Sequence, residues 1–149
     1  MINKMKKIII GSDHAGFKLK EIIKKYLEDL NYKYEDVGAN TKESCDYPDF
    51  SYKVAKKVSE TNGRGIVICG TGIGSCIVAN KVKGIRAALA FDEFTAKMSR
   101  EHNNSNVLCL GSRTTKKELA KKIVKIWLET PFSKEERHQR RVNKIMKLE

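Results

Sequence analysis

A cysteine followed by three closely spaced glycines is the feature of this chain with the clearest chemical potential. The apolar run 66–69 is typical of a strand and ends on Cys69, and Gly70, Gly72 and Gly74 precede residues that favour a helix. Glycines let backbone N–H groups turn toward an anion, and a helix N-terminus adds positive potential there. The same setting favours a thiolate at Cys69. The loop therefore offers a candidate base beside a cradle for negative charge, which predicts proton abstraction next to a carbonyl.

Other readings of this loop are weaker. Its glycines run GTGIG and follow the third predicted strand, whereas a dinucleotide fold carries GxGxxG after the first strand. No Gly-Lys-Ser or Gly-Lys-Thr ending of a nucleotide-binding P-loop is present. A small core cysteine beside a ligand-free turn is the alternative that the sequence leaves open.

Further polar residues come directly after predicted strands or helices. Asp13 and His14 follow the first strand, where they either cap a helix or contact sugar hydroxyls and phosphate. His102 ends a predicted helix beside several asparagines, so it is a candidate general acid near neutral pH or a surface capping residue. Arg113, Arg137 and Arg141 form a candidate phosphate clamp, although each one alone also fits a solvated arginine.

Length and composition indicate a folded enzyme-sized unit. The chain has 149 residues, 40% of them hydrophobic, which predicts a single domain spanning 1–149 with one real core. No apolar run approaches the roughly 20 residues that span a bilayer, and only Ile8, Ile9 and Ile10 follow the basic N-terminus. That run is too short for a signal-peptide core, so we expect a cytoplasmic protein without a membrane partner.

Charge and cysteine content exclude further classes of protein. The net charge is +12, but most lysines interleave with acids on helical faces, which favours solvated surfaces over nucleic-acid binding. Cys45, Cys69, Cys76 and Cys109 form no CxxC pair and no zinc spacing, so we expect neither a metal site nor a disulfide framework.

Strand and helix signals alternate along the chain. Strands are predicted at 7–11, 32–37, 66–69, 85–91 and 107–111. Helices are predicted at 16–31, from a cap at Asp49 to about 60, from the glycine loop to about 81, from a cap at Asp92 through 93–102, and at 115–129. This order predicts an α/β fold, a three-layer Rossmann-like parallel five-stranded sheet with helices on both faces. Ligands then bind at the carboxyl ends of the strands.

The last segment, 133–149, carries a narrow apolar stripe of Val142, Ile145 and Met146. Arg137 and Arg141 are four residues apart and share a helical face. Such a helix packs either against its own domain or against a partner subunit.

Taken together, these motifs resemble the type B ribose-5-phosphate isomerase family, which also includes galactose-6-phosphate isomerase subunits. The resemblance covers nearly the whole chain and is carried by blocks at 11–17 (GSDHAGF), 46–48 (DYP), 69–74 (CGTGIG), 80–81 (NK), 84–87 (GIRA), 99–103 (SREHN), 106–108 (NVL), 111–113 (GSR) and 137–142 (RHQRRV).

The resemblance implies interconversion of ribose 5-phosphate and ribulose 5-phosphate without a metal or organic cofactor. It makes Cys69 the base between C2 and C1, Thr71 an assisting residue, and His102 the group that opens the furanose ring. It also implies a homodimer or tetramer whose active sites mix residues of two subunits, so that the C-terminal helix extends to a partner. The implied substrate-binding residues are Asp13, His14, Tyr47, Gly70, Gly72, Ile73, Gly74, Asn103, Arg113, Arg137 and Arg141.

The chain departs from the family pattern at 134–136, where Lys-Glu-Glu stands in place of the glycine pair of many relatives, and at Ser75 and Cys76. The two glutamates either weaken the phosphate clamp or favour the start of the last helix. A hexose-6-phosphate isomerase acting on allose or galactose 6-phosphate and a non-catalytic sugar-phosphate binder remain as alternatives.

Overall fold

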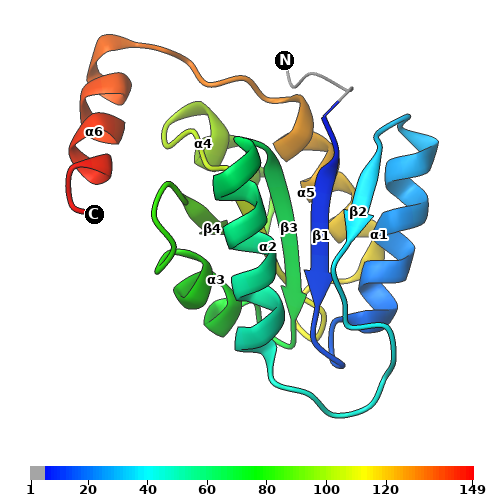
Figure 1. Ribbon diagram of the computed structural model, residues 1–149. Coiled ribbons are helices and arrows are strands. Elements are labelled where there is room, and N and C mark those ends of the chain that lie inside the picture. Colours follow the sequence, from blue (N-terminus) through cyan, green and yellow to red (C-terminus); the bar gives the residue numbers. More distant parts are fainter. Residues whose placement is uncertain (1–5) are drawn as a thin grey trace.

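The computed structural model describes residues 6–149, and its centre is a parallel sheet. The sheet has five strands in the order β2-β1-β3-β5-β4 (Figure 1). The strands are β1 (Ile8–Ser12), β2 (Tyr34–Asp36), β3 (Arg64–Cys69), β4 (Ala87–Leu89) and β5 (Val107–Gly111). The α/β architecture with a parallel five-stranded sheet is therefore confirmed. β4 lies at the edge, so β5 is the inner neighbour of β3.

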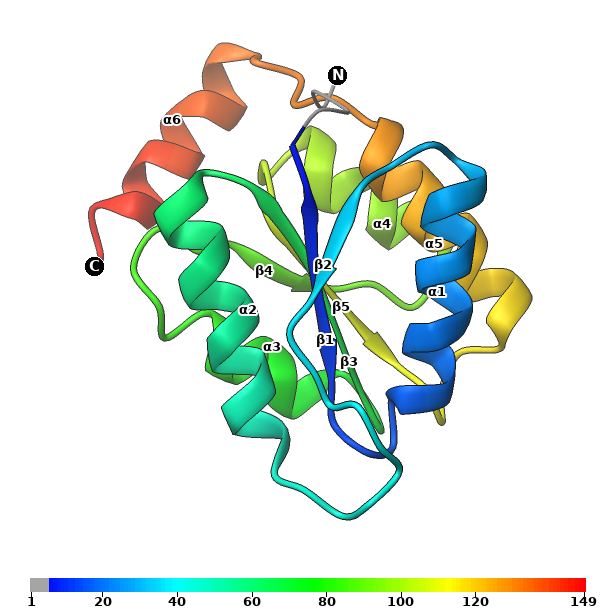
Figure 2. The ribbon, with the colours of Figure 1, turned by 45° about the vertical axis from the view of Figure 1, so that its right-hand side comes forward.

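Helices cover both faces of this sheet (Figure 2). α2 (Tyr47–Thr61) and α3 (Ile73–Ala79) lie against one face. α1 (Phe17–Asp29) and α5 (Lys117–Glu129) lie against the other, and α4 (Glu93–Glu101) packs on α5 and β4. Strand side chains alternate to match: Ile8 and Ile10 are buried in the core under α1 and α5, and Ile9 is buried in the core under α2.

The last helix, α6 (Glu136–Met146), stands apart from these layers (Figure 1). His138 and Val142 form its buried side. Arg86 Nη1 reaches Met146 Sδ at 3.1 Å, and the Gly84 N–H donates to Glu149 Oε1 at 2.7 Å. The rest of the helix, with Arg137 and Arg141, is exposed.

The structure corrects several predicted boundaries. The cap of α2 is Asp46, and Asp49 lies in the first turn, because Pro48 is well placed early in a helix and starts it sooner. The predicted strands 32–37 and 85–91 shrink to three residues each, since only that much of each pairs with its neighbour. The cap at Asp92 is confirmed: its Oδ1 accepts the Thr95 N–H at 2.6 Å.

A buried ion pair fastens α1 to β2. Lys20 is fully buried and donates to Asp36 Oδ2, while Lys24 Nζ lies 2.9 Å from the same oxygen. Burial opposes ionisation of Asp36, but the hydrogen bonds from Lys20 and Lys24 outweigh it and lower the pKa of this carboxyl. The neighbouring pair Glu35–Lys57 is much more exposed.

We expect Asp36→Asn to lower the free energy of unfolding by roughly 2–4 kcal/mol, because it leaves the buried Lys20 ammonium with only the more distant Glu21 carboxylate. The matched change Glu35→Gln breaks the exposed pair and costs less than about 1 kcal/mol. Urea unfolding of both variants at pH 7 measures the difference, and equal losses would contradict the role given to burial.

The same pair predicts acid sensitivity with a definite sign. Because the pKa of Asp36 is lower in the folded state, the unfolded chain binds the proton more readily. The stabilisation is thus complete above the ordinary value of 3.8 and is lost as the pH falls below it. Urea unfolding at pH 5 and pH 3 tests this, and the advantage of the wild type over Asp36→Asn must shrink at the lower pH.

Candidate functional site

The glycine loop lies where β3 ends and α3 begins. Cys69 is the last residue of β3 and is buried, and the Gly72 N–H donates to its Sγ at 3.2 Å. Gly72 has a φ of 78°, and an added Cβ would meet Leu89 Cδ1 at 2.6 Å and the Leu110 carbonyl carbon at 2.9 Å. This glycine is therefore required both by its backbone and by its surroundings. The N–H donor holds the sulfur of Cys69 against the glycine loop.

Tyr47 and Arg113 both contact this loop. A Cβ added to Gly74 would lie 2.5 Å from Tyr47 Cζ, so the phenol ring occupies the space above that glycine. A Cβ added to Gly70 would lie 3.2 Å from Arg113 Nη1, which places the guanidinium against the loop as well. Arg113 is held there because its N–H donates to the Gly70 carbonyl at 2.9 Å.

The remaining predicted residues of this edge lie beside the loop. Asp13 is buried; its N–H donates to the Ile68 carbonyl at 3.3 Å and its Oδ1 accepts the Gly16 N–H at 2.9 Å. His14 Nδ1 lies 3.2 Å from both the N and the O of Cys45, so the direction of that hydrogen bond follows the tautomer. Thr71 is exposed, and its Oγ1 accepts the Ile73 N–H at 3.3 Å. We call this set the cysteine edge: Asp13, His14, Tyr47, Cys69–Gly74 and Arg113.

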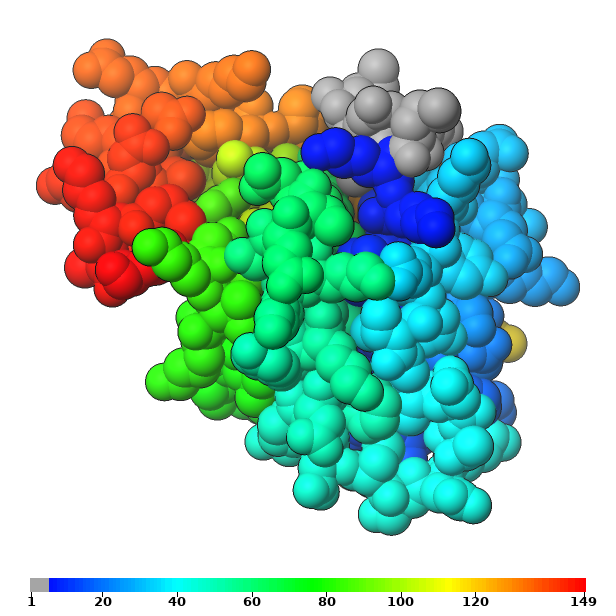
Figure 3. Space-filling model, in the orientation of Figure 1, coloured from blue at the N-terminus to red at the C-terminus, as the bar shows by residue number. Residues whose placement is uncertain are grey.

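His102, Asn103, Arg137 and Arg141 do not join the cysteine edge within one chain. His102 caps the C-terminus of α4, which is followed by the start of β5. Cys69 pairs with Gly111 at the other end of β5, and a strand of this length spans about 13 Å. Figure 3 shows the red atoms of α6 and the cyan atoms before α2 at opposite corners of the molecule. We call this second set the histidine edge.

His138 is the functional candidate that the sequence analysis missed. Its buried ring lies 4.3 Å from the ring of His102, centroid to centroid, and its Nδ1 lies 2.7 Å from Ser133 Oγ. The Ser133 N–H in turn donates to the Glu101 carbonyl at 3.1 Å. Burial, with the nearby charges of His102 and Arg137, lowers the pKa of His138 and favours its neutral ring. The available signal was spacing, since His138 precedes the stripe residue Val142 by four positions.

The departure at 134–136 has a visible consequence. Lys134 has a φ of 59°, in the left-handed region that glycine adopts with less strain. Glu135 Oε2 accepts a hydrogen bond from Arg137 Nε at 2.9 Å. This carboxylate therefore already pairs with one of the candidate phosphate ligands.

The cysteines are all free, and two of them influence each other. The buried Cys109 thiol hydrogen-bonds toward Cys76 and lowers the pKa of Cys76 to about 7, against the opposing effect of burial. Cys76 is half-buried and lies on α3, the helix that follows the glycine loop.

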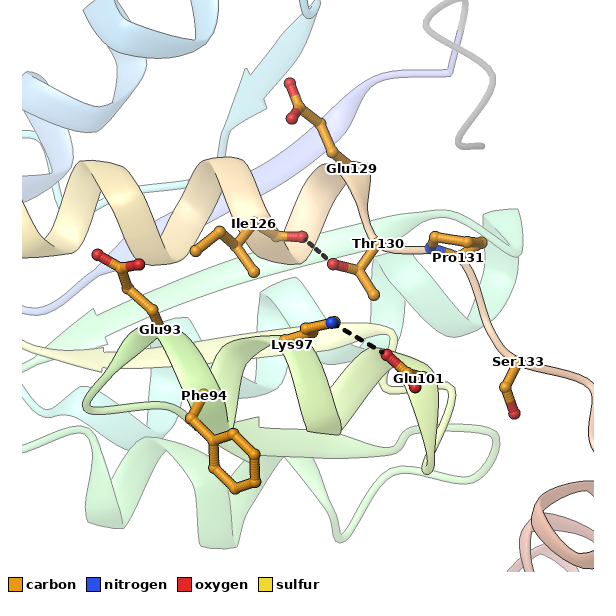
Figure 4. Close-up of a pocket in the computed structure, with 9 residues that line it drawn as sticks. All are labelled: Glu93, Phe94, Lys97, Glu101, Ile126, Glu129, Thr130, Pro131 and Ser133. Atoms are coloured by element: carbon orange, nitrogen blue, oxygen red, sulfur yellow. Dashed lines mark hydrogen bonds and ion pairs between the residues drawn. The ribbon is translucent and has the colours of Figure 1, made fainter.

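A further groove lies outside both edges. A groove of about 680 Å³ runs between α4 and α5, lined among others by Phe94, Glu101 and Ile126, and contains none of the predicted site residues (Figure 4). Residues 6–149 hold no group of three or more histidine, cysteine, aspartate or glutamate side chains suited to a metal ion. Within the same range, no helix is long and apolar enough to cross a membrane.

Comparisons with known proteins identify the family of the chain. The family model described as Ribose/Galactose Isomerase matches residues 8–145. Ribose-5-phosphate isomerase B of Escherichia coli is 45% identical over 147 residues, covering 97% of each chain. D-erythrulose-4-phosphate isomerase of Pectobacterium atrosepticum is 43% identical and covers 86% of each chain. The structure of ribose-5-phosphate isomerase B from Mycoplasma genitalium with bound ribulose-5-phosphate matches with a TM-score of 0.91 and 46% identity, over 95% of both chains. With a family model spanning nearly all of its sequence, this chain belongs to the ribose/galactose isomerase family.

Proposed function

We propose that this protein interconverts ribose 5-phosphate and ribulose 5-phosphate through an enediolate. The observation that carries the proposal is the cysteine edge itself: a buried thiol at a strand end receives a backbone N–H at 3.2 Å inside a glycine loop. Phosphate binders need donors and cations, but they have no need for a thiol base. The named relative and the ribulose-5-phosphate complex of another relative support the pentose as substrate.

In the proposed reaction, Cys69 takes the proton from C2 of the open-chain aldose and returns it to C1. The electron pair left at C2 forms the C1=C2 bond of the enediolate, and the negative charge moves to O1, where the N–H groups of Gly70, Gly72, Ile73 and Gly74 meet it. In this proposal the Gly72 and Ile73 N–H groups turn to that oxygen from Cys69 Sγ and Thr71 Oγ1, which they bond in the free protein. When C1 takes up the proton, the hydroxyl proton of O2 moves to O1 and the ketone forms at C2. Thr71, exposed at the same loop, assists at the reacting hydroxyls. One base serves both carbons because they are adjacent in the substrate.

Substrate binding in this proposal uses the side chains around the loop. Asp13, His14 and Tyr47 contact the sugar, and Arg113 faces the phosphate together with Arg137 and Arg141. Holding a remote phosphate keeps C1 and C2 in register with the sulfur, which lowers the barrier to proton transfer.

We further propose that two copies of the chain complete each site. The histidine edge carries His102, the proposed ring-opening group, with Asn103, Arg137 and Arg141, at the far end of β5 from Cys69. Exposed Ile73 and Ile77 on α3 lie next to the glycine loop and offer an apolar surface to a second copy. The histidine edge of one subunit then supplies the ring-opening group and two phosphate-binding arginines to the cysteine edge of the other.

A different sugar length is the second candidate. A relative of similar identity is named for a four-carbon phosphate, D-erythrulose 4-phosphate. Hexose 6-phosphates need only a slightly longer pocket. Turnover of four-, five- and six-carbon sugar phosphates, measured side by side with EDTA present, ranks these substrates.

Replacing the proposed base gives the first test of mechanism. We expect Cys69→Ala to lower kcat for ribose 5-phosphate by at least about 100-fold, because general-base catalysis is worth that much, while the sugar phosphate still binds. Cys76→Ser is the matched control, since it removes the neighbouring thiol and keeps the proposed base. Normal turnover in Cys69→Ala, measured by ketose formation, would exclude Cys69 as the base.

Mixing two inactive variants tests the shared site. Cys69→Ala and His102→Asn each disable both sites of a homodimer, but a mixed dimer holds one site with both native residues. Refolding an equal mixture should restore about one quarter of the wild-type activity if subunits exchange at random in a two-fold dimer. Two separately refolded samples combined at the end serve as the control. Mixed dimers that form but remain inactive would show that the two edges do not meet.

The glutamate that pairs with Arg137 gives a third test. Glu135→Gln frees this exposed arginine, so we expect KM for ribose 5-phosphate to fall about two- to fivefold with kcat unchanged, as fits a surface ion pair. Glu136→Gln removes an equal charge from a neighbour without that hydrogen bond. The same KM in both variants would argue against Arg137 as a phosphate ligand.

A further inference from the structure

A second cationic pocket lies at the edge of the sheet where the strands begin, away from the cysteine edge. The cavity measures about 360 Å³ and is lined by Lys6, Arg64, Arg86 and Arg100, together with Asn104 and Asn106. No carboxylate is among the described residues that line it. We call it the arginine pocket. Arg113, Arg137 and Arg141 take no part in it.

The three guanidinium groups are held in place by uncharged oxygens. Arg64 Nη1 donates to the carbonyls of Trp127 at 3.4 Å and Leu128 at 3.0 Å. Arg100 donates through Nε to the Thr130 carbonyl at 3.3 Å and through Nη1 to Asn104 Oδ1 at 3.0 Å.

Arg86 is fixed in the same way, through Nε to the Asn104 carbonyl at 3.0 Å. Each guanidinium carries five N–H donors. Those on the Nη2 groups of the three arginines take no part in these bonds. The contacts therefore orient the charges without neutralising them.

The charges also act on one another. Burial, followed by the charges of Arg64 and Arg86, lowers the pKa of Arg100 to about 9. Burial also lowers the pKa of Arg86, and the charge of Glu149 opposes this shift. The Oε1 atom of Glu149 already accepts the Gly84 N–H. The ion pairs of the described chain join none of the four cations of the pocket to a carboxylate. Clustered, partly buried cations that form no ion pair are costly, and a bound anion removes that cost.

We propose that the arginine pocket binds a phosphate group, as a site separate from the catalytic one. Guanidinium forks match the oxygens of a phosphate, and the amides of Asn104 and Asn106 add neutral hydrogen-bonding groups. The volume accommodates a phosphate group with a small organic remainder. The proposal is independent of the isomerase reaction, since it uses none of the residues assigned to that reaction.

A bound anion also has a structural consequence. Arg100 and Asn104 flank His102 and Asn103 in one segment, Arg64 begins β3, and Arg86 precedes β4. One anion contacting these arginines ties three segments together, so its binding stabilises the fold around the histidine edge.

Calorimetric titration with inorganic phosphate, at constant ionic strength, tests the pocket in the full chain. The background variant Arg113→Gln/Arg137→Gln/Arg141→Gln removes the exposed arginines of the proposed catalytic site. We expect it to bind one phosphate per chain. Adding Arg64→Gln should weaken that affinity at least about tenfold, as expected for lost charge-assisted hydrogen bonds, whereas adding Lys125→Gln on the exposed side of α5 should not.

Lys6→Gln keeps the test decisive if Arg64→Gln fails to fold, because Lys6 is exposed and its ammonium bonds only the Asn62 carbonyl among the described residues. We expect about a threefold loss of affinity from this change in the same background. No phosphate binding by the background variant, or equal binding by the pocket variants and Lys125→Gln, would overturn the proposal. Glycerol 3-phosphate distinguishes between two sources of the bound phosphate group. An affinity equal to that of inorganic phosphate indicates a phosphorylated metabolite, and a much weaker affinity indicates free phosphate.

Discussion

The pairing of β3 with β5 is the constraint on which the site depends. Cys69 lies opposite Gly111, and the pairing continues beyond the strands, because the Ser112 N–H donates to the Cys69 carbonyl at 2.8 Å and the Arg113 N–H to the Gly70 carbonyl at 2.9 Å. The segment after β5 thereby holds the start of the glycine loop, and Gly72 donates its N–H to the sulfur of Cys69. A candidate phosphate-binding arginine and a candidate base thus reach one edge through backbone geometry.

The same strand also separates the two halves of the site. β5 begins just after the segment that carries His102 and ends beside Cys69, so its length keeps these residues apart in any one chain. α6 stays with the histidine edge because His138 packs on His102 and Ser133 holds both His138 and the end of α4. In the proposed mechanism, the ring-opening group and the base therefore act on one sugar only if two chains meet.

Much of this could be predicted from the sequence, and the reasons for the rest are physical. The apolar run of Ile8, Ile9 and Ile10 predicts a strand, and the glycines predict a loop whose backbone approaches other groups closely. Strand order could not be predicted, because periodicity indicates which side chains are buried but not which strands are neighbours. The sequence therefore does not predict that β5 pairs with β3 and that β4 lies at the edge. His138 escaped notice because its buried position depends on a loop contact with Ser133.

The effect of the net charge of +12 on anion binding depends on where the cations are held. Lysines such as Lys122 pair with nearby acids at the surface and have little effect beyond solubility. The arginines differ, because backbone oxygens fix Arg64, Arg86 and Arg100, and the glycine loop fixes Arg113. Carbonyl oxygens orient a guanidinium without cancelling its charge, so such positions keep their attraction for anions. By this reasoning, Arg137 is the weakest of the three proposed phosphate ligands Arg113, Arg137 and Arg141, since Glu135 cancels part of its charge.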